Sequence, residues 1–393
     1  MNARRLAGPA LAAALRDSRQ RLRRLVDDLD ESQWRIPHQA GINPIAWELG
    51  HVAWFAEFWT QRGPHLVGSD GFVHAARPAR IAGPDETFDS ARLPHAQRWD
   101  LPTPERAELF ARLEAQLAET IAAMPTGDSD AALYFHRLAL LHEDMHAEAF
   151  CWLRATLGYP APEGARLRAL RGEGVIRLDR ASTSLGYVAD EAGFAFDNER
   201  PSMAVQLEPF EIDSRCVTAG EFCRFVNAGG YDDPDHWPGD AGLWRRQAAR
   251  SHPARWRLAA PGGEWQQRWF DRWSPLDPNQ PVVHVSAYEA QAYCRWVGRR
   301  LPTAAEWGHA AATLPADAFD WGDSVWEWTA SPFLPYPGFV VGPYKDYSAP
   351  WFGDHRELRG GAFATHPRLQ DRRYRNFFRP ERCDIFAGFR TAH

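Results

Sequence analysis

Two histidines spaced four residues apart are the first residues in this 393-residue chain whose types and spacing indicate chemistry. His142 and His146 lie in the stretch LHEDMHAEAF, within an apolar-periodic run from Leu133 to Leu157 that is typical of a helix. Side chains four positions apart share one helical face. Paired imidazoles are good ligands for a transition metal, although a single buried histidine is more often a packing residue. The pair leaves both interpretations open, a metal site and satisfied core histidines.

The same stretch also matches the zinc-protease pattern His-Glu-x-x-His, in which Glu143 would be the general base. On these residues alone, a zinc hydrolase is an alternative function.

Amphipathic helices must position these histidines. Apolar periodicity predicts four helices, at residues 8–29, 43–62, 104–124 and 133–157. In the second, Asn43 is the expected N-cap before Pro44, and His51 lies within a stripe of aromatic side chains that we interpret mainly as core. Four such helices with one long crossover are typical of a four-helix bundle, whose core is a common place for metal sites.

The crossover, residues 63–102, is long, rich in Pro and Gly, and weakly periodic. Insertions of this length without regular structure usually carry function or cover a site. We therefore expect this segment to serve whatever site the bundle holds.

The character of the sequence changes after residues 158–174, which we interpret as a linker. Of the 18 tryptophans, 12 lie beyond residue 180, among many Gly and Pro residues, which favours a loop-rich, mixed α+β domain. Helices are expected at residues 218–227 and 286–297, and Thr303 with Glu306 forms the capping box of a third. The predicted domains of this α+β multidomain chain are residues 1–165 and 175–393.

Composition excludes several classes of function. The net charge of −6 and a pI near 6.2 give no basic surface for nucleic acid. No run approaches the roughly 18 apolar residues of a membrane span. Five cysteines without C-x-x-C spacing argue against a disulfide framework, so a reducing cytoplasm fits best. We interpret the N-terminal stretch as an amphipathic helix rather than a signal peptide, because Arg16, Asp17 and Arg19 interrupt its apolar run.

The second half carries specific phrases: VTAGEFCRFVNAGGY (217–231), PVVHVSAYEAQAYCRWVGRRLPTAAEW (281–307), SVWEWTASPF (324–333) and LRGGAFAT (358–365). Together they resemble the formylglycine-generating-enzyme-type, C-type-lectin-like domain. A formylglycine-generating enzyme works with a pair of reactive cysteines near its C-terminus, whereas Cys383 has no evident partner in the sequence. The resemblance therefore implies the fold and not that activity.

In the first half, WELGHVAWF and LHEDMHAEAF resemble a DinB-type four-helix bundle. Its fusion to the second domain is the architecture of the ergothioneine-type sulfoxide synthases, which are non-haem iron(II), oxygen-dependent enzymes. The resemblance implies Fe(II) as the cofactor, with His51, His142 and His146 as its ligands. Imidazole suits iron as well as zinc, and three imidazoles leave positions open for O2 and a chalcogen ligand. The zinc-protease interpretation ignores both His51 and the second domain.

The stretch PGFVVGPYKDYSAPWF matches a Tyr-x-x-Tyr phrase of this family through Tyr344 and Tyr347. The resemblance implies that Tyr344 donates a proton or hydrogen atom during the oxygen chemistry. This donation directs the reaction toward carbon–chalcogen bond formation rather than thiol dioxygenation. A phenol suits that role, and a packed loop tyrosine is the alternative interpretation.

The phrase RNFFRPER (375–382) matches family residues that hold hercynine, the trimethylated histidine. By this resemblance Asn376 is a polar contact, and Phe377 supplies a ring face for the quaternary ammonium group. Tyr347 and Arg382 are assigned to the same substrate site.

Two positions depart from family members that use gamma-glutamylcysteine. Phe378 stands in place of an acidic residue, and Met145 in place of a glutamine within the histidine pair; both are assigned to substrate binding. Those members also use arginines of the first-domain loop, for which Arg92 and Arg98 are candidate counterparts. Without a carboxylate to pair with its ammonium group, an amino-acid donor is disfavoured. The chain therefore most resembles the selenoneine synthase branch, whose donor is a selenosugar.

The inferred function is an iron(II)- and O2-dependent enzyme that joins a 1-selenosugar to C2 of the hercynine imidazole, with no nucleic-acid or membrane partner. The nearest alternative keeps hercynine and uses gamma-glutamylcysteine or cysteine as donor. A non-catalytic lectin-like binding protein and a zinc hydrolase are further alternatives. The presence of the three histidines and Tyr344 argues against a non-catalytic binding protein, because a bundle that had lost its catalytic function would not need these residues.

Overall fold

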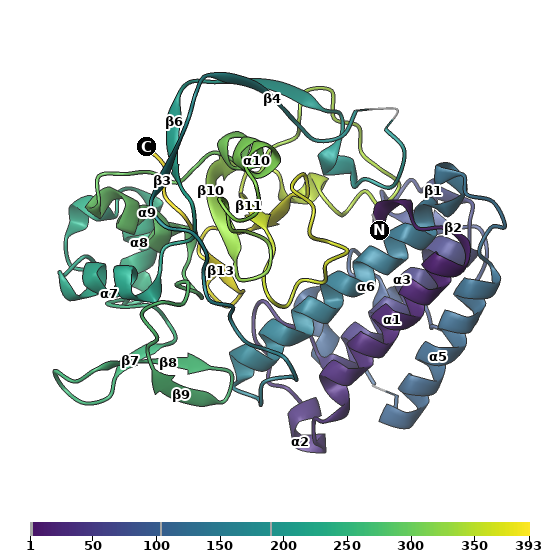
Figure 1. Cartoon of the computed structure of the whole chain (residues 1–393). Helices are drawn as coiled ribbons and strands as arrows, with labels where there is room; N and C mark the ends of the chain where they lie inside the picture. The colour runs from purple at the N-terminus through teal and green to yellow at the C-terminus, as the bar shows by residue number, and fades with distance from the viewer. Residues whose placement is uncertain (1–2, 103, 189–190) are drawn as a thin grey trace. The chain divides into compact units, whose positions relative to one another are not determined.

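The computed structural model describes residues 3–102, 104–188 and 191–393 (Figure 1). The chain forms two compact units. The first comprises Met1–Leu153 with Ala192–Ala195, and the second comprises Arg154–Glu191 with Phe196–His393. The first unit is mainly helical and the second mixes helices with small sheets, which confirms the expected α+β multidomain class.

The first unit is built on long helices, of which α1, α3, α5 and α6 run side by side (Figure 1). The described helices are η1 (Ala3–Arg5), α1 (Gly8–Asp27), α2 (Glu31–Trp34), α3 (Ile45–Gln61), α4 (Asp85–Phe88), η2 (His95–Trp99), α5 (Arg106–Ala122) and α6 (Asp130–Leu157). Strands β1 (His65–Val67) and β2 (Val73–Ala75) form an antiparallel hairpin. None of the described helices combines the length and apolar composition that crossing a membrane requires.

The four predicted bundle helices are confirmed, with two local corrections. Pro44 and not Asn43 occupies the N-cap of α3. The Asn43 side chain is used elsewhere, because its amide donates to Glu48 and its oxygen accepts from Arg98. The apolar periodicity of α6 predicts a buried stripe of Leu138, Leu141, Met145, Ala149 and Trp152, but Met145, Ala149 and Trp152 are only half-buried. The fully buried positions include Leu140, Ala147 and Phe150, because α6 packs on more than one face.

The crossover between α3 and α5 contains regular structure, namely β1, β2, α4 and η2, which its weak periodicity did not predict. Hydrogen bonds hold it against α3. The buried Glu57 carboxylate accepts backbone N–H groups of Arg80, Ile81 and Ala82 at 2.6, 3.1 and 2.8 Å. Arg62, just after α3, pairs with Asp85 at 2.6 Å. These bonds fix α4 against α3 because each buried charged group has a partner.

The second unit contains a four-stranded sheet of order β12-β11-β10-β13, in which only the β10–β13 pair is parallel. Its strands are β10 (Trp326–Pro332), β11 (Arg356–Gly360), β12 (Asn376–Phe378) and β13 (Ala387–Gly388). The other strands are β3 (Val175–Leu178) with β6 (Phe210–Asp213), β4 (Ala181–Leu185) with β5 (Met203–Leu207), and β7 (Trp256–Leu258), β8 (Trp265–Trp269) and β9 (Arg272–Pro275).

Four α-helices accompany these sheets in the described part of the second unit. They are α7 (Ala219–Asn227), α8 (Asp240–Gln247), α9 (Ala287–Trp296) and α10 (Ala304–Thr313), with short turns η3 (Asp197–Glu199), η4 (Pro234–His236) and η5 (Ala349–Trp351). The predicted helices appear as α7, α9 and α10, and Thr303 and Glu306 form the expected capping box. The short, polar α8 escaped prediction because its eight residues hold little apolar periodicity.

A buried ion pair stabilises the core of the second unit. Arg390 and Glu327 meet at 2.5 Å with side chains 0% and 1% exposed. The same carboxylate accepts the indole N–H of Trp307 at 2.9 Å. Removing one partner leaves the other charge buried without compensation.

We therefore expect Glu327→Ala to lower the free energy of unfolding by about 3–5 kcal/mol, the cost of a broken buried pair. Glu208→Ala is the matched control, because its ion pair with Arg180 is solvent-exposed and exposed pairs contribute at most about 1 kcal/mol. Urea unfolding followed by tryptophan fluorescence measures both. Equal effects of the two substitutions would contradict this role of Glu327.

Candidate metal centre

Three histidines from two helices converge inside the first unit. His51 comes from α3, and His142 and His146 come from successive turns of α6. One ring nitrogen from each lies within 4.8 Å of the others. The Nε2 atoms of His142 and His146 are 3.2 Å apart. The structure thus brings together the three residues that the resemblance names as ligands.

Hydrogen bonds at Nδ1 orient two of these rings. His51 Nδ1 lies 2.7 Å from the carbonyl oxygen of Phe88, and His146 Nδ1 lies 2.7 Å from Oε1 of Glu48. A carbonyl and a carboxylate accept hydrogen bonds, so each imidazole carries its proton on Nδ1. The lone pair of each Nε2 is then available, as in metal sites whose ligands are oriented by outer partners.

Aromatic neighbours and burial set the state of the rings. His142 stacks on Phe55 at 3.6 Å and 6°, and His51 stacks on Trp47 at 5.1 Å and 10°. Burial, with a smaller contribution from the neighbouring His146, holds the pKa of His51 and of His142 well below 6.5. Both imidazoles are therefore neutral at pH 7, the form that coordinates metal.

The oxygen that orients His51 depends on a close approach between α4 and α3. A Cβ added at Gly50 would lie 2.2 Å from the ring of Phe88, so only glycine admits that ring. Two indole N–H groups of α3 hold the same segment, Trp47 to the Thr87 carbonyl at 2.7 Å and Trp54 to Asp85 at 2.8 Å. The crossover therefore serves the histidine cluster by supplying a hydrogen-bond acceptor.

Sequence reasoning missed the residues around the three histidines. Glu48 had a signal, because it is one of only two acidic residues in a mostly apolar helix and stands three positions before His51. Such a residue is almost never fully buried without a partner. No sequence signal marked the Phe88 carbonyl, because every residue type carries a backbone oxygen.

The two acidic residues inside the histidine pair point to other partners. Glu143 is 2% exposed and binds Arg19 of α1 through both oxygens, at 2.7 and 3.1 Å. Asp144 accepts a hydrogen bond from Ser18 at 2.9 Å. A carboxylate committed to a buried arginine is poorly placed to act as a general base. This arrangement argues against the zinc-protease interpretation.

The two candidate arginines of the crossover have different surroundings. The Arg98 guanidinium lies 4.0 Å over the ring of Trp47, which itself stacks on His51. Arg92 pairs with Asp89 at 3.1 Å and lies over Phe72. Of the two, Arg98 is the closer neighbour of the histidine cluster.

In the second unit, three predicted residues form one aromatic group. The ring centroids of Tyr344 and Tyr347 are 5.9 Å apart, and those of Tyr347 and Phe377 are 5.8 Å apart. Phe377 stacks on Phe333 at 4.0 Å and 12°, which covers one face of its ring. Burial, and then the neighbouring Tyr374, raises the pKa of Tyr347 well above 10. Tyr347 therefore stays protonated at neutral pH.

The other predicted residues on β12 lie on the opposite face of the strand. Side chains alternate along a strand, so Asn376 and Phe378 project away from Phe377. The Arg382 guanidinium lies 5.1 Å over the Phe378 ring and pairs with Asp384 at 2.6 Å. The predicted substrate residues of the second unit thus fall into two groups, one on each face of β12, whereas Met145 is half-buried on α6 of the first unit.

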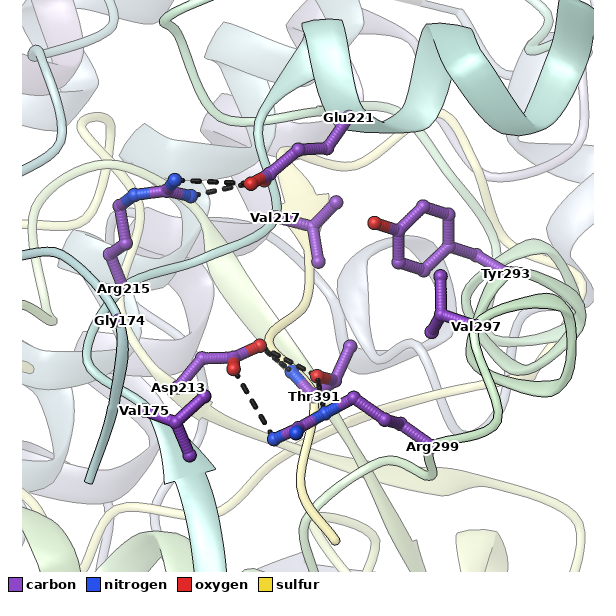
Figure 2. A pocket seen from close by; sticks show the side chains of 10 residues that line it. All are labelled: Gly174, Val175, Asp213, Arg215, Val217, Glu221, Tyr293, Val297, Arg299 and Thr391. Carbon is purple, nitrogen blue, oxygen red and sulfur yellow. Dashed lines mark hydrogen bonds and ion pairs between the residues drawn. The ribbon is translucent and has the colours of Figure 1, made fainter.

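A separate pocket of about 290 Å³ lies in the second unit near β6, α7 and α9 (Figure 2). Its charged groups are paired with one another: Arg215 binds Glu221 at 3.0 and 3.1 Å, and Asp213 binds Arg299 at 3.3 Å (Figure 2). None of the predicted site residues lines it. These pairs serve the packing of the unit and provide no separate candidate centre.

Comparison with known proteins defines the class of this chain. The DinB superfamily model matches residues 14–149, and the sulfatase-modifying factor enzyme 1-like domain model matches residues 168–325. A formylglycine-generating enzyme from Streptomyces coelicolor is 29% identical and covers 61% of this chain and 94% of its own length. The protein is thus a DinB-type bundle fused to a formylglycine-generating-enzyme-like domain, as expected from the sequence.

Two relatives match almost the whole chain. The hercynine oxygenase of Mycobacterium tuberculosis is 31% identical over 97% of this chain and 98% of its own. The hercynine oxygenase of Mycolicibacterium thermoresistibile is 30% identical over 97% and 94%. The chain therefore belongs to the hercynine oxygenase family and is an oxidoreductase. The suspected family is confirmed.

Gly50→Ala tests the contact that positions the Phe88 carbonyl. Alanine normally stabilises a helix relative to glycine by about 0.5–1 kcal/mol, but here its methyl group overlaps the Phe88 ring. We expect the opposite sign, a loss of about 1–3 kcal/mol typical of overpacking. Nitrogen NMR of the imidazoles should show His51 losing its fixed Nδ1–H tautomer.

Gly127→Ala is the control for this experiment, because nothing lies within 4 Å of the added methyl group. Unchanged stability and an unchanged His51 tautomer in Gly50→Ala would show that the close approach is dispensable.

Proposed function

We propose that His51, His142 and His146 hold Fe(II) and that this chain is an O2-dependent enzyme acting on hercynine. The observation that carries the proposal is the cluster of three buried or half-buried imidazoles with nitrogen atoms within 4.8 Å. Three imidazole donors, two of which have Nδ1 held by an oxygen acceptor, fit Fe(II), although they also fit zinc. The iron-dependent family resemblance and the names of the full-length relatives favour iron. Fe(II), when bound, supplies the activation of O2.

The protein's own groups have distinct proposed roles. Phe88 and Glu48 keep the proton of His51 and His146 on Nδ1, so that each Nε2 faces the metal. Tyr344 donates a proton from its hydroxyl group during bond formation, as the family resemblance implies. The family resemblance assigns both Asn376 and Phe377 to hercynine. Because these side chains project from opposite faces of β12, Phe377 is the one that shares a surface with Tyr347, and its uncovered ring face is directed at the quaternary ammonium group.

The donor that is joined to hercynine is a second question. The names of the relatives support the sulfur alternative, with gamma-glutamylcysteine or cysteine as donor, better than the selenosugar. One observation favours selenium. Phe378 has the Arg382 guanidinium above its ring, and this cation is already paired with Asp384. The Asp384 carboxylate beside this ring is thus already neutralised by Arg382 and gives a donor ammonium group little stabilisation, whereas a neutral sugar needs none.

The metal assignment is tested by anaerobic Fe(II) titration of single variants. Each of His51→Ala, His142→Ala and His146→Ala should weaken binding by at least about 10-fold, since even outer-shell changes act on that scale. Each should also abolish turnover of hercynine with O2. Tyr344→Phe should retain iron and lose about 10²-fold or more in rate, because only the proton donor is removed.

His74→Ala is the matched control, since His74 is exposed and pairs with Asp70 outside the cluster. Full Fe(II) binding after loss of His51 would refute the three-histidine site. Activity that persists in zinc without O2 would replace the proposal with a hydrolase.

A competition assay tests the donor. The kcat/KM values of selenosugar, thiosugar, cysteine and gamma-glutamylcysteine should be compared in wild type and Phe378→Asp. If Phe378 excludes ammonium donors, the wild type prefers the sugars, and the new carboxylate shifts preference toward the amino-acid thiols. Wild-type preference for gamma-glutamylcysteine would eliminate the selenium candidate and leave the sulfur one.

A further inference from the structure

One carboxylate holds both ends of the loop that carries the two tyrosines. We call residues 342–348 the tyrosine loop. The backbone N–H of Gly342 donates to Oδ2 of Asp197 at 3.2 Å. The hydroxyl of Ser348, which is fully buried, donates to Oδ1 of the same residue. Asp197 therefore bridges the first and last residues of the loop.

The residue before Asp197 adds a third contact to the loop. Phe196 stacks on Tyr347 with ring centroids 4.4 Å apart and an angle of 21°. The Tyr347 hydroxyl lies 3.2 Å from that of Tyr374, whose ring also meets Phe196 edge-on. Phe196 and Asp197 together thus contact the first residue of the loop, Tyr347 and the last residue of the loop.

The fit between the loop and Asp197 is close. A Cβ added at Gly342 would lie 3.1 Å from the Asp197 Cβ, nearer than most contacts of this kind. Burial raises the pKa of Asp197, whereas the Ser348 and Gly342 hydrogen bonds act in the opposite direction. Donors from the loop therefore stabilise the carboxylate, and the carboxylate in turn stabilises the closed loop.

We propose that Asp197 is a positioning residue that clamps the tyrosine loop and so fixes Tyr344 for proton donation. The clamp stands on contacts within the second unit, and its effect on turnover rests on the function proposed for Tyr344. Reacting groups displaced by about 1 Å can lose roughly 10²-fold in rate, so a loop held at both ends matters for chemistry.

The sequence provides a direct probe of this loop. Lys345 is the only lysine of the chain, so a lysine-specific endoprotease cleaves at this one position, inside the tyrosine loop. Cleavage requires local opening of the loop, and its rate follows the population of the open form. We expect Asp197→Ala to increase the rate at Lys345 by at least about 10-fold, the effect of losing both hydrogen bonds.

Two further variants should give cleavage rates at Lys345 between those of the wild type and Asp197→Ala. Ser348→Ala removes only one of the two bonds, and Asp197→Asn keeps one acceptor oxygen, so both should give intermediate rates. Asp271→Ala, at an exposed turn, is the matched control and should be cleaved as the wild type. Melting temperatures separate local opening from global unfolding. If Asp197→Ala does not fold, Ser348→Ala carries the test.

Turnover supplies the second readout. Asp197→Ala should keep its Fe(II) content and lower kcat by about 10-fold or more, with a smaller change in the KM for hercynine. Asp197→Asn should restore part of the rate. Wild-type cleavage rates in both Asp197→Ala and Ser348→Ala would overturn the clamp. Faster cleavage with unchanged turnover would keep the clamp and refute the role given to Tyr344.

Discussion

The histidine cluster depends on one constraint, that a ring nitrogen of each imidazole be free of a proton where the three rings meet. Burial removes the charge of His51 and His142, and an oxygen acceptor fixes the proton of His51 on Nδ1. That acceptor is a backbone carbonyl of the crossover, so the crossover must be rigid. Gly50 admits the Phe88 ring, and Glu57 binds three backbone N–H groups of the same segment. The crossover is thus a structural part of the histidine site.

Helix α6 places its acidic side chains and its histidines on different faces. Its central stretch contains two acids and two histidines within five residues, which the helical period distributes over different faces. The acids meet Arg19 and Ser18 of α1, so their buried charge is compensated. The imidazoles face His51 of α3. Pairing Glu143 with Arg19 therefore leaves the histidine face free of a competing carboxylate other than Glu48.

Sequence reasoning succeeded where the signal is local. Apolar periodicity predicted the four bundle helices, and the Thr303 capping box marked α10 correctly. It failed where structure depends on contacts between distant residues. The order β12-β11-β10-β13 joins strands by pairings that no local pattern encodes, and the hairpin of β1 and β2 lies in a segment without clear alternation.

The candidate site shows the same difference between local sequence signals and contacts between distant residues. The spacing of His142 and His146 is visible in the sequence, because one helix carries both. His51 joined them only through the family resemblance, since its segment reads as aromatic core. The orienting oxygen of Phe88 and the bridging carboxylate of Asp197 are tertiary features. Both required the folded chain to be seen.

The position of β12 leaves room for variation at Phe378. This strand lies at the edge of its sheet, paired only with β11 among the described strands. Phe378 is half-buried there, so a change of side chain disturbs little of the core. Glu327 and Arg390, by contrast, are fully buried and cannot vary independently. A substitution at position 378 therefore changes the charge at this sheet edge while the fold and the histidine cluster remain intact.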